Sequence, residues 1–360
     1  MNFKLQVLFW FGAFIVFVLF CWVLGDVLLP FVAGMVLAYL LNPLADRLER
    51  HGVHRLLATL IVLGVFILLF VLAIIIVVPL LGSQLLQFIQ RVPEYFRLLQ
   101  DLIVTEANQD WIRRMIGTET LDLRKSVGDL VGQGAAWAGT FLGGIWSGGR
   151  ALLSLVAVLV VTPIVTLYLL LDWHRMVNKV DSWLPRDHRN TIRSLAREID
   201  TVLAGFIRGQ AIVSLVLGTF YAIALTLTGL NFGLLIGFAA GVLNFIPYLG
   251  STAGLLLAGG VALAQFWPDW PWVLVVVGIF FFGQFVEGYF LQPKLVGERV
   301  GLHPVWLIFA LFAFGYLLGF LGLLIAVPLA AAFGVLVRFA LRQYLASPLY
   351  TGASQKSGKR

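Results

Sequence analysis

The chain has 360 residues, of which 60% are hydrophobic and 12% are charged. A soluble globular domain cannot cover so much apolar surface, so the composition excludes that class and indicates a polytopic membrane protein. The 25 basic and 18 acidic residues give a net charge of +7, which in such a chain indicates the sidedness of loops rather than binding to nucleic acid.

Near-continuous apolar runs follow one another along the chain and predict membrane helices. They cover residues 7–24, 27–41, 56–81, 152–171, 202–227, 232–246, 252–267, 272–291 and 305–341. Several reach the roughly 20 residues that a helical crossing needs, and others have the length of half-helices or re-entrant legs. The first run ends in GDVLLP instead of a small-residue cleavage site, so we expect the N-terminus to be retained.

Basic residues concentrate in four regions, and the positive-inside rule assigns these regions to the cytoplasm. They include Arg47, Arg50, Arg55, Lys294, Arg299, Lys356, Lys359, Arg360 and the arginines of residues 172–208. Both termini are then predicted to be cytoplasmic. Alternation of the runs places residues 82–150 outside.

This outer segment carries a seam of apolar residues spaced alternately three and four apart, which predicts a helix that packs against a partner helix. The seam consists of Leu85, Phe88, Val92, Tyr95, Leu99 and Leu102. Pro93 interrupts it. An amphipathic helix that lies on the membrane or folds against its own chain is the alternative.

Motifs of membrane enzymes are absent from the sequence. It contains no His-Glu-x-x-His, no phosphate-binding Gly-x-x-x-x-Gly-Lys-Ser/Thr, and histidines only in or beside predicted loops. The lone Cys21 excludes a disulfide within the chain. We therefore predict no catalytic residues, no bound metal, no cofactor and no nucleic-acid partner.

Glu287 is unusual because it stands at the end of an apolar run, and an ionisable residue at membrane depth usually faces a cavity or a partner. Gln284 lies one helical turn before it and Gln292 lies close to the same face. Arg208 and Gln210 begin another span, and we predict that Arg208 pairs with Glu287 in a gate. Structural pairing, or exposure of Glu287 at the headgroup level, are the alternatives.

The segment LNFIPYLGSTAG, residues 243–254, breaks an apolar region in its middle through Asn244, Pro247, Gly250 and Ser251. Proline removes a backbone donor, so backbone groups are freed where only protein or trapped water can satisfy them. Broken helices of this kind often line transport sites. A tight turn at the membrane surface is the alternative.

A weak repeat relates two blocks of the second half of the chain. GLNFGLLIGF from Gly229 and GLHPVWLIFA from Gly301 begin alike, and Leu249-Gly250 and Leu321-Gly322 follow at the same offset. The predicted sidedness makes them inverted repeats. Each block is expected to be an apolar helix, a glycine-containing break and a second apolar helix.

Several of these stretches together resemble the autoinducer-2 exporter family of PerM-type bacterial permeases. They are PFVAGMVLAYLLNPLADRLER, PIVTLYLLLDWHRM from Pro163, RGQ from Arg208, NFIPYLGS from Asn244 and QPKLVGERVGLHPVWLIFALFAFGYLLGFLGLLIAVPLAA from Gln292. The resemblance implies an all-α inner-membrane protein of about eight helices with an extramembrane helical arm. It also implies a homo-oligomer, for which we consider a pentamer. Some members are assigned to export of autoinducer-2, and others to exchange of sodium or lithium for protons.

These functions need different chemistry. A neutral polyol needs donors and acceptors, which Gln210, Asn244, Ser251 and Gln284 could supply, whereas an exchanger needs a carboxylate such as Glu287. We favour export of a small polar solute, with cation/proton exchange second and a structural membrane protein third. The expected divisions are membrane helices in residues 1–81, an arm in 82–150, a transport core in 151–346 with a loop at 172–200, and a tail in 347–360.

Overall fold

The computed structural model describes residues 12, 16, 23–107, 149–296 and 303–351. In this part of the chain the secondary structure is helical and contains no strand. Seven helices are long and apolar enough to cross a membrane, and a shorter apolar helix, α8 (Gly233–Leu243), accompanies them. The predicted all-helical, multi-pass class is therefore confirmed. Nearly all of the first predicted run lies outside the described residues.

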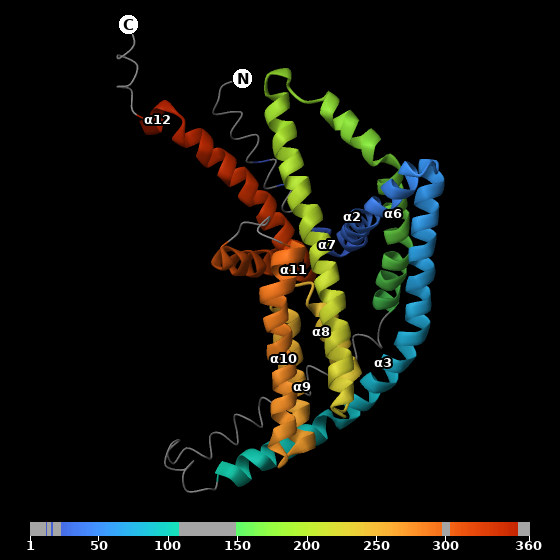
Figure 1. Cartoon of the computed structure of the whole chain (residues 1–360), viewed down its shortest axis with the longest axis vertical. Coiled ribbons are helices and arrows are strands. Elements are labelled where there is room, and N and C mark those ends of the chain that lie inside the picture. Colours follow the sequence, from blue (N-terminus) through green and yellow to red (C-terminus); the bar gives the residue numbers. More distant parts are fainter. Residues whose placement is uncertain (1–11, 13–15, 17–22, 108–148, 297–302, 352–360) are drawn as a thin grey trace. The chain divides into compact units, whose positions relative to one another are not determined.

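The helices follow the predicted apolar runs because backbone groups in lipid must be satisfied within the segment itself. Besides α8 they are α2 (Gly25–Arg50), α3 (Arg55–Ala107), α6 (Gly149–Ser182), η1 (Arg186–His188), α7 (Arg189–Leu227), α9 (Leu249–Phe266), α10 (Trp270–Val286), η2 (Glu287–Val296), α11 (Pro304–Leu345) and α12 (Pro348–Thr351) (Figure 1).

Helix α3 continues far beyond the length of one crossing. Its 53 residues correspond to about 80 Å at the usual rise per residue, against a hydrocarbon core of about 30 Å. Pro79 and Pro93 lie inside it. The predicted start of the arm at residue 82 thus falls inside this helix, and the arm is described only as far as Ala107.

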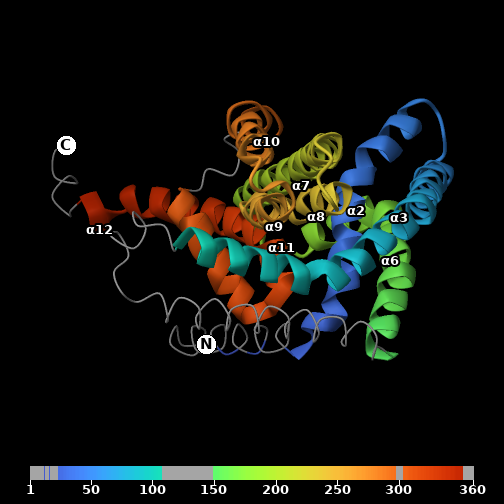
Figure 2. The ribbon, with the colours of Figure 1, turned by 90° about the horizontal axis from the view of Figure 1, so that it is seen from below.

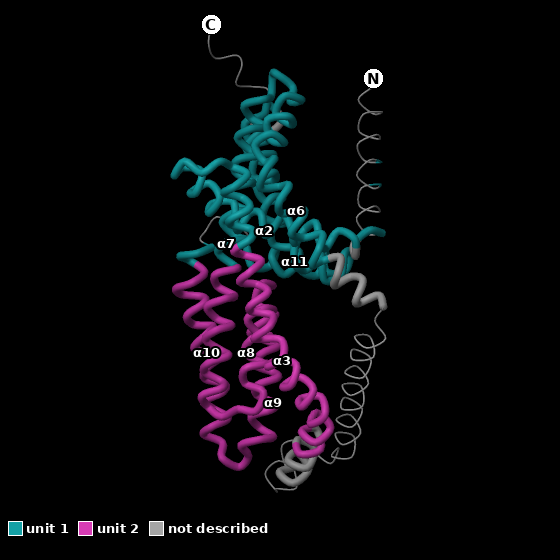
Figure 3. Tube along the Cα trace, turned by 90° about the vertical axis from the view of Figure 1, so that its right-hand side faces the viewer, with its two compact units in different colours: residues 1–64, 156–210, 293–360 teal, residues 65–155, 211–292 magenta. Residues whose placement is uncertain are grey.

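The chain forms two compact units, each assembled from segments that are distant in sequence (Figure 3). Unit 1 comprises residues 1–64, 156–210 and 293–360, and unit 2 comprises residues 65–155 and 211–292. The divisions expected from the sequence were continuous stretches, and they stay predictions.

In unit 2, α8 lies against the second half of α7, with α9 and α10 alongside (Figures 1 and 2). Glycines four residues apart on α8 allow this approach, because a side chain at Gly237 or Gly241 would overlap the α7 backbone at Ala222 or Gly218. Small residues at such spacing let membrane helices pack closely. These two glycines therefore allow α8 to pack closely on α7.

The described part of the predicted seam packs within the same chain. The rings of Phe88 and Tyr95 meet Phe232 edge to face, with centroids 5.3 Å and 6.3 Å away. Gln84 of α3 accepts a 3.1 Å hydrogen bond from the backbone of Leu235. The alternative of a helix folded against its own chain is thus confirmed for these residues, while the side chains of Leu99 and Leu102 lie outside the described part. Assembly into an oligomer through this seam stays a prediction.

Both repeat blocks consist of a helix, a break and a second helix, as predicted. In unit 2 the break separates α8 from α9. In unit 1 it lies inside α11, where Gly319 has φ 60° and ψ −137°. A Cβ at Gly322 would overlap the carbonyl oxygen of Phe314, although residues eight apart in a continuous helix are about 12 Å apart. The chain therefore folds back at Gly319.

Unit 1 is held by apolar and polar contacts between α2, α6, α7 and α11. Phe206 and Ile207 of α7 pack with Val327 of α11 in one buried cluster. The hydroxyls of Thr162 and Thr166 on α6 donate to backbone carbonyls of α2, at 3.2 Å and 3.1 Å. These contacts position the polar residues of α7 that lie in unit 1.

Candidate functional site

The carboxylate of Glu287 is buried in unit 2, with 8% of the residue exposed. Three neutral amides donate to it: Gln284 at 2.8 Å, Asn244 at 3.4 Å and Gln292 at 3.4 Å. We call these four residues the Glu287 cluster. The predicted proximity of Gln284 and Glu287 is confirmed, and Glu287 is buried rather than exposed in this structure, while its depth in the membrane stays a prediction.

Gln292 reaches the cluster because of a change in helix type. From Glu287 onwards, α10 continues as the π-helix η2 (Glu287–Val296). Hydrogen bonds in a π-helix join residues five apart, so residues 287 and 292 lie one above the other, which an α-helix would not allow. Such segments occur frequently at functional sites.

Asn244 enters the cluster from the break between α8 and α9. Its backbone nitrogen still donates to Ala240 at 2.9 Å, and the chain then leaves the helix through Pro247 and through Tyr248, whose φ is 68°. The Asn244 side chain is fully buried. The predicted break is therefore confirmed, and it brings an unpredicted amide to Glu287 from 43 residues away.

Gly250 and Ser251 form the first turn of α9, immediately after the break. A Cβ at Gly250 would overlap the carbonyl oxygen of Ala240 and the nitrogen of Asn244, so glycine is what allows the two legs to meet. Ser251 is buried, and its hydroxyl lies 3.5 Å from the carbonyl oxygen of Tyr248. Both residues thus shape the break, and the described structure shows no hydrogen bond between Ser251 and Glu287.

Tyr221 of α7 is a member of this region that the sequence analysis missed. It is fully buried, and its ring stacks on Phe280 at 4.6 Å between centroids. Gly283, the residue before the amide Gln284 that donates to Glu287, leaves the space for the Tyr221 hydroxyl. A tyrosine inside an apolar run is typical of a hydrophobic core. Only its hydroxyl group could have indicated a position beside polar residues.

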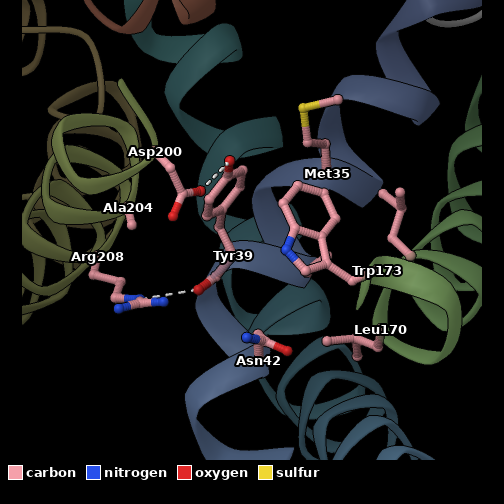
Figure 4. A pocket seen from close by; sticks show the side chains of 10 residues that line it. Met35, Tyr39, Asn42, Leu170, Trp173, Asp200, Ala204 and Arg208 are labelled. Atoms are coloured by element: carbon pink, nitrogen blue, oxygen red, sulfur yellow. Dashed lines mark hydrogen bonds between the residues drawn. The ribbon is translucent and has the colours of Figure 1, made fainter. Parts of the chain in front are cut away.

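The RGQ motif, Arg208 to Gln210, lies on α7 within unit 1. Arg208 donates through Nε to the carbonyl oxygen of Tyr39 at 3.0 Å, in unit 1 (Figure 4). Gly209 lets α7 approach the backbone of Leu295, and Gln210 is fully buried. Arg208 and Glu287 each have partners within their own unit, so the predicted ion pair between them stays a prediction.

The Glu287 cluster can accept and donate hydrogen bonds at once. A carboxylate only accepts, whereas each amide offers both an N–H donor and a carbonyl acceptor. No group of three or more histidines, cysteines or acidic residues able to hold a metal ion was found among the described residues. The cluster therefore provides a compact polar site between apolar helices.

Seven apolar helices, a helix broken beside a buried carboxylate and a π-helical segment define a multi-pass membrane protein with a buried polar cluster. Comparison with known proteins supports this class. Residues 11–342 match the AI-2E family transporter profile. The chain belongs to this family.

Two relatives are named for transport without a stated substrate. YrrI of Bacillus subtilis (strain 168) is 31% identical over 89% of this chain and 88% of its own length. PerM of Escherichia coli (strain K12), named as a permease, is 30% identical over 85% of both chains. A third relative, the AI-2 transport protein TqsA of Escherichia coli (strain K12), is 24% identical over 89% of this chain and 86% of its own length.

Proposed function

We propose that the protein exports a small polar solute across the bacterial inner membrane and that the Glu287 cluster contacts this solute. The observation that carries the proposal is a carboxylate, 8% exposed, surrounded by three amides at the junction of a broken helix and a π-helix. A solute hydroxyl can donate to Glu287 while its oxygen accepts from an amide. Binding of the solute would replace the hydrogen bonds between the amides and Glu287 with hydrogen bonds to the solute.

Autoinducer-2 is the solute that we propose first. It is a polyhydroxylated molecule, which matches the donors and acceptors of the cluster, and the name of TqsA states the same substrate for a relative. Basic residues near residues 47–55 and 175–208 support cytoplasmic termini. A homo-oligomer in the bilayer belongs to the same proposal.

Exchange of sodium or lithium for protons is the second candidate. The observation that favours it is that the three hydrogen-bond partners of Glu287 are neutral amides. A buried carboxylate without a countercharge tends to take up a proton or a cation. Amide carbonyls turned toward Glu287 would complete an oxygen site of the kind that hard cations prefer.

The experiment compares the parent protein with Glu287→Gln in proteoliposomes. Efflux of autoinducer-2 and sodium-dependent proton movement are measured in parallel. We expect Glu287→Gln to lower autoinducer-2 efflux by about tenfold or more, the effect of losing a charged hydrogen bond, while the melting temperature stays close to that of the parent. Glu94→Gln, at an exposed carboxylate of α3, is the matched control.

The outcomes separate the candidates. Normal efflux and normal proton movement in Glu287→Gln would exclude the cluster as the transport site. Sodium-dependent proton movement by the parent, without efflux of autoinducer-2, would replace the first candidate by the second.

A further inference from the structure

A polar cavity in unit 1 shares no residue with the Glu287 cluster. It has a volume of about 70 Å³ and lies between α2, α6 and α7 (Figure 4). Its polar lining comes from Tyr39, Asn42, Asp200 and Arg208, and its apolar lining includes Trp173. The space is sufficient for several water molecules or for one small solute.

Tyr39 orients both charged groups of this cavity. Its hydroxyl donates to Oδ1 of Asp200 at 2.9 Å, and its carbonyl oxygen accepts from Nε of Arg208 at 3.0 Å. The carbonyl is available because residue 43, four positions later in α2, is a proline and has no N–H. Tyr39 therefore contacts the Asp200 carboxylate through its side-chain hydroxyl and the Arg208 guanidinium through its backbone carbonyl.

The two charged residues stand on one face of α7 with a small residue between them. Asp200, Ala204 and Arg208 are spaced four residues apart. The Cα atoms of the two charged residues are therefore about 12 Å apart along the helix. The methyl group of Ala204 leaves the intervening space open. The result is an acceptor at one end of the cavity, a donor at the other, and a net charge of zero.

The opposite wall is aromatic and firmly supported. Trp173 of α6 packs edge to face on Tyr39, with centroids 5.8 Å apart. Asn42 accepts a 2.7 Å hydrogen bond from Arg55, which also donates to the carbonyl oxygen of Leu170 at 2.8 Å. These contacts tie α2 to α6, so the wall is preformed.

We propose that this cavity is a second solute site, specific for small neutral polyhydroxylated molecules. Hydroxyls along such a molecule can donate to Asp200 and accept from Arg208 at the same time, while the C–H groups lie on the rings of Trp173 and Tyr39. The ammonium and carboxylate groups of a small amino acid such as alanine are bonded to the same carbon, so they cannot pair with both ends of the cavity. Asp200 is solvent-exposed, so its charge is hydrated and needs no countercharge from the ligand.

The inference rests on the proposed function, because a site for the same class of solute on α7 would load the transporter from the side that the sequence predicts to be cytoplasmic. Binding at the cavity is nevertheless measurable without transport. Its failure and the failure of the Glu287 site can therefore be told apart.

The test measures binding of radiolabelled ribose to the purified full-length protein by equilibrium dialysis. The background carries Glu287→Gln, so that the other site is weakened. Asp200→Asn, which keeps an acceptor for Tyr39, is expected to weaken ribose binding about tenfold or more, and Trp173→Leu by several-fold. Asp187→Asn, at an exposed carboxylate of η1, should bind like its parent, and unlabelled alanine should not compete.

Three results would overturn the proposal: no ribose binding in the Glu287→Gln background, equal binding after Asp200→Asn, or displacement of ribose by alanine. Asp200→Asn decides the question by itself if Trp173→Leu does not fold. If Glu287→Gln transports normally while Asp200→Asn loses ribose binding, the function proposed for Glu287 fails and the cavity site stands.

Discussion

The two helical breaks occupy equivalent repeat positions but have different chemistry. With the offset that relates Gly250 to Gly322, Pro247 corresponds to Gly319. The first break lies between α8 and α9 and uses a proline, and the second lies inside α11 and uses a glycine with φ 60°. In both, the following glycine allows the two legs to touch.

Polarity separates the two breaks. Asn244 is fully buried and donates to Glu287, whereas the equivalent residue, Tyr316, is 90% exposed. Ser251 of the first break corresponds to Leu323 of the second. The comparison teaches that the backbone break is a shared structural device, and that only the first break supplies polar side chains to a candidate site.

The largest loss of stability is expected from substitutions at the glycines where the two helices of each broken block meet. Gly250→Ala and Gly322→Ala would each place a Cβ on a backbone oxygen of the preceding leg. We expect each variant to lose about 3 kcal/mol or more of stability, because backbone must move. The measurement is the melting temperature of the purified protein in detergent.

Gly259→Ala in α9 is the control for both. A Cβ there would have no neighbour within 4 Å in the described structure, so the melting temperature should stay the same or rise slightly. A parental melting temperature in either Gly250→Ala or Gly322→Ala would contradict the tight hairpin.

Substitutions of Gly319 and Pro247, the residues that break the two helices, should differ in their effect on stability. Gly319→Ala places a side chain at φ 60° and ψ −137°, which is expected to cost about 1–3 kcal/mol through backbone strain alone. Pro247→Ala introduces no such strain, so it should change the folding free energy by less than about 1 kcal/mol and impair transport more than folding. Melting temperature and vesicle efflux of both variants test this, and equal losses of melting temperature would show that the two breaks are alike.

The last expected effect concerns transport and compares the polar residue of the first break with its equivalent in the second. Asn244→Ala removes one donor from Glu287 and should lower efflux about tenfold, which corresponds to about 1.4 kcal/mol. Tyr316→Ala, at the equivalent exposed position, should leave efflux unchanged. Similar efflux from both variants would mean that the polar break has no special part in transport.

Local pattern was sufficient for much of the architecture. Apolar runs, Pro247 and the glycines predicted the helices and the break, and spacing by one turn predicted that Gln284 meets Glu287. The ion pair of Arg208 with Glu287 stays a prediction, whereas the hydrogen bond from Arg208 to the Tyr39 carbonyl, which Pro43 of the same helix leaves open, was not predicted. Sequence spacing contains no information about such a contact between helices.

By itself, the sequence determined that this is a helical membrane protein with two broken blocks, because hydrophobicity and helix-breaking residues act over a few neighbouring positions. Tertiary structure alone decided which polar groups meet. The contact of Asn244 with Glu287 joins residues 43 apart, and that of Tyr39 with Asp200 joins residues 161 apart. Gln292 reaches Glu287 only because the helix widens to π geometry there. These contacts depend on packing between helices, which no local periodicity encodes.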